Sequence, residues 1–316
     1  MMQHNEHPRR VTLIDAHHHL WDLQHIHYPW LSSWRQDTFM GDYRPLMKNY
    51  LPADYKRDSA RHTVLATVHC EADCDENDEV KETRWLHQQA TETGMPSAVI
   101  AHVWFHQPTC EEILRQHCAF PRVRGIRSKP VTAATPGQRF SVKGTPGSMQ
   151  DERWLDGFSL MEKFGLSWDL RVPCWHLKEA AEVARAFPSI PVVLNHMGFP
   201  WDRSPEGLTM WREGMLSLAE CPNVCVKISE LGGPGLAWTV DNHQDVIHET
   251  IQMFGINRCM FASNFPVAGL QIAYDQLVDN MAEIMSSYTQ AEQEAFFWRN
   301  ALSFYRITLP HQISAT

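Results

Sequence analysis

The feature that most constrains the fold is an alternation of short apolar runs with amphipathic segments, repeated eight times along the chain. The runs are rich in β-branched or other apolar side chains, as expected for parallel strands that are buried on both faces. They lie at residues 11–15, 64–69, 97–103, 123–126, 166–170, 191–194, 224–228 and 260–262.

Amphipathic segments between the runs end at residues that stop helices. Three of them are residues 77–93 before Gly94, residues 177–187 before Pro188 and residues 241–254 before Gly255. Strand–helix alternation repeated eight times predicts an α/β protein with a (β/α)8 TIM barrel, whose typical size is about 250 residues.

The chain has 316 residues, and the extra length falls in two loops at residues 20–61 and 128–153. In a barrel, long loops after strands lie on the catalytic face. No internal repeat or linker divides the sequence. We therefore expect a single barrel domain over residues 11–316, preceded by a disordered or extended N-terminal arm at residues 1–10.

Charge and cysteine content argue against several classes of protein. The net charge of −9 is unlike that of a general nucleic-acid binder, which usually carries a basic patch. No apolar run approaches the roughly 18 residues of a membrane span, and the polar first ten residues do not resemble a signal peptide. The eight scattered cysteines are expected to be free thiols. These features predict a cytoplasmic protein with no nucleic-acid or membrane partner.

The sharpest chemical feature is Asp15-Ala16-His17-His18-His19 at the end of the first run. Because side chains alternate across a strand, Asp15, His17 and His19 are expected to share one face, with His18 on the other. If the shared face is the barrel interior, two imidazoles meet at the C-terminal mouth, with the carboxylate one layer deeper. Neutral imidazoles in such a position can bind a divalent metal such as zinc.

This strand end, followed by Leu20-Trp21-Asp22 and then Tyr28-Pro29-Trp30-Leu31, resembles the amidohydrolase superfamily. More narrowly, it is similar to the lactonase-containing amidohydrolase-2 branch, which includes L-fuconolactonases and 2-pyrone-4,6-dicarboxylate lactonases. Further stretches match that branch in order, so that the similarity runs from about residue 11 to residue 300. They are residues 82–85, 125–127, 193–200, 227–229 and 261–267.

The resemblance implies a metal site, and this chain differs from the usual pattern of the branch at one position of that site. It implies that His196, after the sixth run, faces the reacting carbonyl or the metal together with His17 and His19. The branch usually has an aspartate at the end of strand 8, which deprotonates the attacking water and often touches the metal. This chain has Asn264 there, and an amide has no basic carboxylate. Zinc is the expected ion, but the missing anionic ligand lowers the expected affinity and leaves metal binding open.

Several groups can replace the missing base. We rank the three histidines first and Glu230 second, because Glu230 lies on a Gly-rich loop that can bend into the mouth. Asp169, at the end of the fifth run, and Glu71, just past the second, are further candidates. Asn264 is expected to orient a water or a substrate hydroxyl rather than to deprotonate it.

Cationic and aromatic side chains are expected to bind the substrate. Arg127, which ends the fourth run, suits a carboxylate or a lactone oxygen, as does Lys227. The alternative for Arg127 is an ion pair inside the barrel, for which Glu71 is a candidate partner. Glu71 is otherwise expected to be a polar group of the site that binds the substrate. Aromatic residues of the first long loop are expected to cover the site and stack on a ring-shaped substrate, with ordinary loop packing as the alternative. They are Trp21, Tyr28, Trp30 and Trp34.

These features together predict a hydrolase that opens a lactone, either a sugar lactone or a muconolactone-like cyclic ester, by attack of an activated water. The expected partner is a small-molecule substrate, a carboxylated or hydroxylated lactone, and the barrel is compatible with a homo-oligomer. Two alternatives stand beside this prediction. One is a metal-dependent decarboxylase of the same superfamily, and the other is a barrel that has lost catalysis and only binds a ligand.

Overall fold

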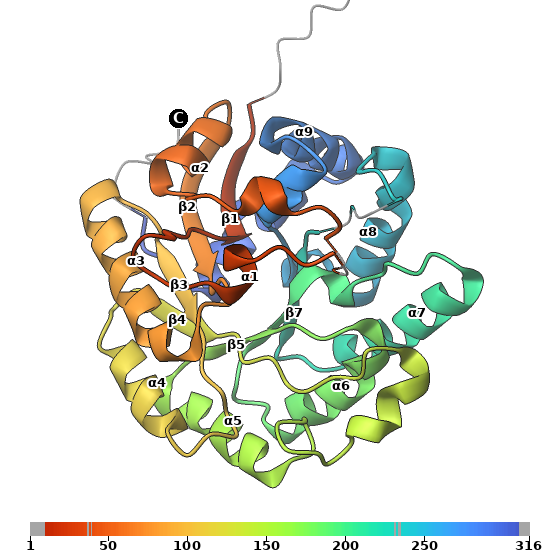
Figure 1. Ribbon diagram of the computed structural model, residues 1–316. Coiled ribbons are helices and arrows are strands. Elements are labelled where there is room, and N and C mark those ends of the chain that lie inside the picture. The colour runs from red at the N-terminus through yellow and green to blue at the C-terminus, as the bar shows by residue number, and fades with distance from the viewer. Residues whose placement is uncertain (1–9, 37, 39, 231, 233–234, 310–316) are drawn as a thin grey trace, which may run out of the picture.

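The centre of the computed structural model is a sheet of eight parallel strands, each paired with the next one in the sequence (Figure 1). The structure describes residues 10–36, 38, 40–230, 232 and 235–309. The strands are β1 (Thr12–His18), β2 (Thr63–Cys70), β3 (Ala98–Ala101), β4 (Val123–Ile126), β5 (Ser167–Leu170), β6 (Val192–Leu194), β7 (Val224–Ile228) and β8 (Cys259–Phe261). Every predicted run overlaps one of these strands, which confirms the predicted barrel.

Helices surround the sheet, and one of them follows each strand (Figure 1). In chain order these are α2 (Pro52–Asp58), α3 (Glu79–Thr93), α4 (Cys110–Cys118), α5 (Glu152–Phe164), α6 (Leu177–Ala186), α7 (Pro205–Ala219), α8 (Val240–Phe254) and α9 (Tyr274–Ile284). The short helix α1 (Pro29–Ser32) lies in the first long loop. Helices α10 (Gln290–Glu294) and α11 (Asn300–Phe304) follow α9. The predicted stop at Gly94 is present, because this glycine takes a left-handed φ of 84° after α3.

Small and apolar side chains fill the interior of the barrel, and larger ones pack between the strands and the helices. Strand side chains of the interior group are Ile14, Ala16, Ala66, Val68, Cys70, Ala98, Ile100, Val193, Met260 and Ala262. Tyr305, which follows α11, belongs to the same buried group. The last part of the chain therefore completes the core of the barrel.

The barrel closes between β8 and β1 through backbone hydrogen bonds just beyond the end of β8. The amide of Asn264 donates to the carbonyl oxygen of His17 at 2.7 Å, and the amide of His19 donates to that of Phe265, also at 2.7 Å. This seam holds the residues after β8 against the histidine-rich end of β1.

The prediction that Asp15 shares a face with His17 and His19 is wrong. Asp15 does not share a face with His17, because a register shift between Asp15 and His18 interrupts the alternation along β1. Its carboxylate instead accepts hydrogen bonds from the backbone amide of Ser263 at 2.9 Å and the hydroxyl of Tyr55 on α2 at 2.7 Å. Asp15 therefore ties the strand to the surrounding helix layer and lies outside the barrel interior.

Three other predictions concern the chain as a whole. All eight cysteines are free thiols, as expected. Among the described residues, no helix is both long and apolar enough to cross a membrane. The predicted arm at residues 1–10 lies outside the described residues except for Arg10.

Candidate active site

A pocket with a cavity volume of about 370 Å³ opens where the strands end. Its walls come from the ends of β1, β2 and β4 to β8 and from the first long loop. The lining residues are His19, Trp30, Thr38, Met40, Ala72, Asp73, Arg127, Arg171, His196, Glu230, Asn264 and Val267. A hollow of about 600 Å³ beside α2 and α9 contains none of the predicted site residues. The pocket at the strand ends is therefore the candidate site.

Six of the predicted site residues line this pocket, namely His19, Trp30, Arg127, His196, Glu230 and Asn264. The others lie behind the lining and are almost fully buried. They are His17, Trp21, Tyr28, Glu71 and Lys227. These five residues support the pocket from behind, and their predicted contact with substrate or metal stays a prediction.

Glu230 and His196 form a close pair in the pocket. One carboxylate oxygen of Glu230 lies 3.2 Å from Nε2 of His196, and Nδ1 of His196 lies 2.7 Å from the hydroxyl of Ser229. Burial raises the pKa of Glu230 to about 7, although Arg171 and Arg127 act in the opposite direction. Burial also holds the pKa of His196 well below its ordinary value. Glu230 can thus exchange a proton near neutral pH.

His19 and Asn264 form a second pair across the barrel seam. Nδ1 of His19 lies 2.7 Å from the carbonyl oxygen of Cys70, and Nε2 lies 3.2 Å from Oδ1 of Asn264. Both partner oxygens only accept hydrogen bonds, and a neutral imidazole carries a single N–H, so the ring donates to one of the two oxygens at a time. Burial lowers the pKa of His19 to about 4, so the ring is neutral at pH 7.

Four pocket residues have a left-handed backbone that non-glycine residues seldom adopt. Their φ values are 57° at Asp73, 56° at His196, 47° at Glu230 and 56° at Asn264. Such conformations cost of order 1–3 kcal/mol each and tend to cluster at functional sites. In this pocket they occur two or three residues after the ends of β2, β6, β7 and β8.

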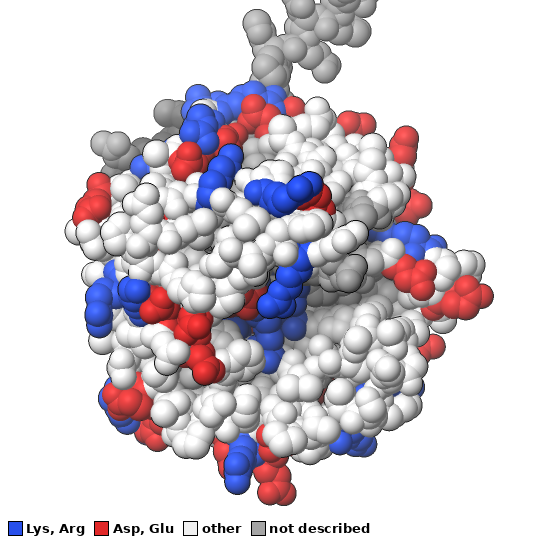
Figure 2. All heavy atoms as spheres, viewed as in Figure 1, with Lys and Arg blue, Asp and Glu red and all other residues white. Residues whose placement is uncertain are grey.

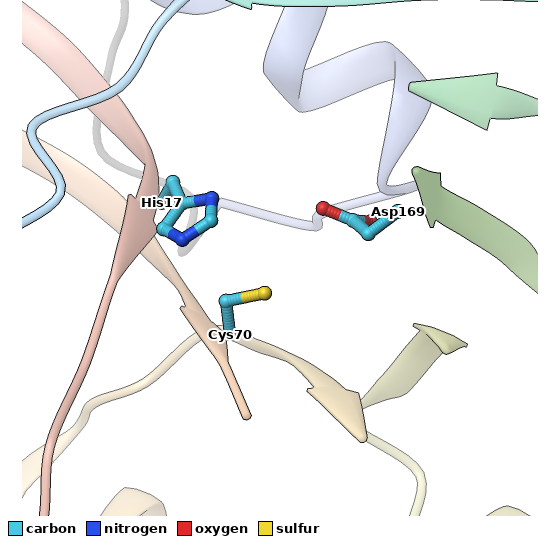
Figure 3. Close-up of side chains that lie close together, drawn as sticks. All are labelled: His17, Cys70 and Asp169. Carbon is cyan, nitrogen blue, oxygen red and sulfur yellow. The ribbon is translucent and has the colours of Figure 1, made fainter. Parts of the chain in front are cut away.

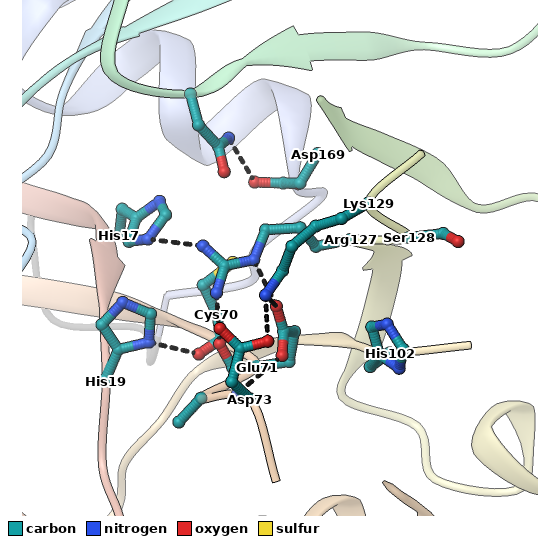
Figure 4. Close-up of polar contacts among 12 residues, drawn as sticks. His17, His19, Cys70, Glu71, Asp73, His102, Arg127, Ser128, Lys129 and Asp169 are labelled. Atoms are coloured by element: carbon teal, nitrogen blue, oxygen red, sulfur yellow. Dashed lines mark hydrogen bonds and ion pairs between the residues drawn. The ribbon is translucent and has the colours of Figure 1, made fainter. Parts of the chain in front are cut away.

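Arg127 is fixed in place by an ion pair, as the alternative reading of the sequence anticipated. Its Nε donates to a carboxylate oxygen of Glu71 at 2.5 Å and a terminal nitrogen donates to the Glu71 carbonyl at 2.6 Å (Figure 4). Lys129 approaches the same carboxylate at 3.3 Å. Burial opposes ionisation of Glu71, but these two cations hold its pKa well below the ordinary value. The other terminal nitrogen of Arg127 lies 3.5 Å from Nε2 of His17.

Beneath the pocket floor, His17, Cys70 and Asp169 from three different strands point toward one another (Figure 3). Their ligand atoms lie within 4.8 Å of one another, so this group can hold a metal ion. Within the described part of the chain, the three predicted histidines do not form such a group together. The amino group of Lys227 forms a short ion pair with Asp169 and lies 3.5 Å from Nδ1 of His17.

Sequence reasoning missed Arg171. It directly follows β5 and lines the pocket, and its guanidinium carbon lies 5.1 Å from the centre of the Phe199 ring. Its charge contributes to the low pKa of His196. The signal that identified Arg127, a cation directly after a strand, also applies to Arg171. Figure 2 shows Lys and Arg atoms inside a hollow near the centre of this face.

The aromatic residues of the first long loop divide into two groups. Trp30 lines the pocket, and its indole nitrogen donates to the carbonyl of Ala72 at 2.8 Å. Trp21 and Tyr28 are buried behind it, with Tyr28 donating to Glu82 at 3.0 Å. Trp34 is 42% exposed and packs against Arg44. Among the predicted aromatic residues, only Trp30 lines the described pocket.

Comparisons with known proteins agree with this architecture. The family model described as Amidohydrolase matches residues 14–307. A protein of Sinorhizobium fredii named y4mH is 35% identical, and the alignment covers 94% of this chain and 99% of that protein. An L-fucono-1,5-lactonase of Burkholderia ambifaria is 25% identical, with coverage of 94% and 96%. The crystal structure of an amidohydrolase from Burkholderia multivorans with bound zinc has a TM-score of 0.75 at 20% identity, with coverage of 94% and 100%.

Proposed function

Because the chain belongs to the amidohydrolase family, we propose that it opens a lactone by attack of an activated water. The observation that carries this proposal is the Glu230–His196 pair, which shares one pocket with two guanidinium groups. Lactone hydrolysis needs a deprotonated water, a polarised carbonyl and donors for the tetrahedral oxyanion. The lactonase name of the Burkholderia ambifaria relative supports this substrate class.

Glu230 is the proposed general base. A base works best when its pKa lies near the working pH, and the pKa of Glu230 is about 7. His19, with a pKa of about 4, and His196, whose pKa is also lowered, accept a proton less readily. When Glu230 is ionised, Nε2 of His196 donates to its carboxylate and fixes its direction. This choice reverses the order in which the sequence ranked the candidate bases.

In the proposed reaction, Glu230 carries one proton from the attacking water to the departing ring oxygen. Water loses a proton to Glu230 as its oxygen bonds to the lactone carbonyl carbon. Arg127 and the Asn264 amide donate hydrogen bonds to the resulting oxyanion. The ring C–O bond then breaks, and the departing ring oxygen takes the proton back from Glu230. The product is an open-chain hydroxy acid.

Arg171 is the proposed contact for a carboxylate substituent of the substrate. A planar guanidinium suits a carboxylate, and both Arg171 and Arg127 line the pocket. The basic hollow in Figure 2 supports an anionic substrate. Among the substrates predicted from the sequence, these features favour a carboxylated lactone over a merely hydroxylated one.

The nitrogen, sulfur and oxygen donors of His17, Cys70 and Asp169 are of the kinds that zinc takes. These three residues would hold a divalent metal, which we propose to be zinc. When bound, the metal supplies positive charge beneath the pocket floor. The proposed proton transfers involve only the attacking water, Glu230 and the ring oxygen of the substrate.

The test is a panel of acidic and neutral lactones, including sugar lactones and muconolactones, followed with a pH indicator and by mass spectrometry. The proposal expects acid release and a product heavier than the substrate by one water. Release of CO₂ instead would identify a decarboxylase. Absence of turnover across the panel, together with tight ligand binding, would identify a binding protein and overturn the proposal.

The free cysteines favour a reducing compartment, and we infer the cytoplasm as the location. A homo-oligomer stays a prediction, which light scattering of the purified protein can check.

A further inference from the structure

The centre of the barrel holds a buried cation that belongs to the chain itself. Lys227 on β7 is fully buried, and so are His17, Cys70 and Asp169 around it. An isolated buried ammonium is costly, so its neighbours must compensate the charge. The contacts of Lys227 show how this is done.

Three neighbours of Lys227 offer groups that attract a cation. Its amino group is bonded to Oδ1 of Asp169, lies 3.5 Å from Nδ1 of His17 and lies 5.2 Å from the centre of the Tyr305 ring. Asp169 in turn accepts hydrogen bonds from the Tyr305 hydroxyl at 3.2 Å and from the Asn195 amide at 3.1 Å. These contacts form a polar cage around one positive charge.

The same cage contains the donors that a divalent metal would use. Two of the three potential ligands, His17 and Asp169, already contact the ammonium group. Zinc binds nitrogen and oxygen at about 2.0–2.2 Å, so it would need the same lone pairs. A metal ion that used these lone pairs would also lie close to the Lys227 ammonium, and two cations that are close together in a buried site repel each other strongly. The ammonium and a metal are therefore alternative occupants of one position.

We propose that Lys227 is the resident cation of this position and that a divalent metal binds only in competition with it. The ammonium keeps Asp169 neutralised and holds positive charge on the Nδ1 side of His17. Arg127 lies on the Nε2 side of the same ring, at 3.5 Å. The ring of His17 thus lies between two cations of the protein.

The test compares zinc affinity in the wild-type protein and in Lys227→Met by competition with a chromophoric chelator. Loss of the ammonium should tighten zinc binding by about 10- to 100-fold. With Co²⁺ as the probe, the variant should also show a thiolate-to-cobalt absorption band, because Cys70 becomes a ligand. Addition of zinc should raise the Tm of the variant more than that of the wild type.

Two control variants separate binding at this position from adventitious binding elsewhere. Lys227→Met with Asp169→Asn removes both charges and one ligand, so the gain in zinc affinity should vanish. Lys227→Met with Cys70→Ser should lose the cobalt band. Equal zinc affinity in the wild type and Lys227→Met overturns the proposal. If Lys227→Met does not fold, Lys227→Gln replaces it and must also bind zinc more tightly than the wild type. These readouts do not use lactone turnover, so they stand or fall separately from the proposed activity.

Discussion

Nε2 of His19 lies 3.2 Å from Oδ1 of Asn264, across the seam at which β8 closes onto β1. The two ends of the barrel sheet thus meet at the pocket. Backbone hydrogen bonds across the seam fix the main chain of both residues, so the closure of the barrel determines where their side chains lie. A substitution at Asn264 can therefore change the chemistry while the backbone bonds that close the sheet remain.

Replacement of Glu230 by Gln should reduce kcat/KM by about 100- to 10,000-fold, because the amide cannot accept a proton. In the wild type, kcat/KM should rise with pH through about 7, since only the ionised carboxylate acts as the base. The variant should lose this rise. Glu220→Gln is the control, because Glu220 is paired with Arg185 at the surface. An unchanged pH profile in Glu230→Gln would show that another group is the base.

Replacement of Arg171 by Met should raise KM for a carboxylated lactone by about 10- to 100-fold, the range expected for a lost hydrogen bond to a charged group. The methyl ester of the same lactone should be affected much less, because it lacks the negative charge. Arg153→Met, at an exposed position on α5, serves as the matched control. Equal increases in KM for the acid and for the ester would mean that Arg171 does not bind the substrate carboxylate.

Replacement of Asn264 by Asp should raise the metal content of the purified protein, because it places an anionic carboxylate beside Nε2 of His19, and these two groups together can ligate a divalent metal. Elemental analysis of untreated protein measures the effect. Asn242→Asp adds the same charge on the exposed start of α8 and should leave metal content unchanged. If metal content and rate are both unaltered in Asn264→Asp, this position is not part of the reacting site.

Replacement of Gly157 by Ala should destabilise the fold without touching the pocket. A Cβ at Gly157 would lie 2.0 Å from the carbonyl oxygen of Phe105, so α5 would have to move away from the segment after β3. Overpacking of this kind costs about 1–3 kcal/mol in the free energy of unfolding. Gly137→Ala is the control, because no heavy atom lies within 4 Å of the place that its added methyl group would take. Urea unfolding of both variants tests the difference, and equal midpoints would contradict the expected clash.

The sequence predicted the barrel well, because eight buried strands and their helix stops leave clear periodic signals. It also placed Arg127, His196 and Asn264 correctly at strand ends that line the pocket. It failed at Asp15, because a local register shift in a strand leaves no mark in the pattern of side chains. It could not separate pocket residues from those one layer deeper, such as Lys227, because depth depends on the stagger of neighbouring strands.

The hydroxyl of Tyr305 reaches Asp169 from a position close to the end of the described chain. During synthesis, β5 leaves the ribosome more than a hundred residues before this donor exists, because Asp169 and Tyr305 are 136 residues apart. The carboxylate of Asp169 therefore gains this hydrogen-bond donor only when the segment after α11 has packed against the barrel. A chain cut short before Tyr305 would leave the innermost carboxylate without it.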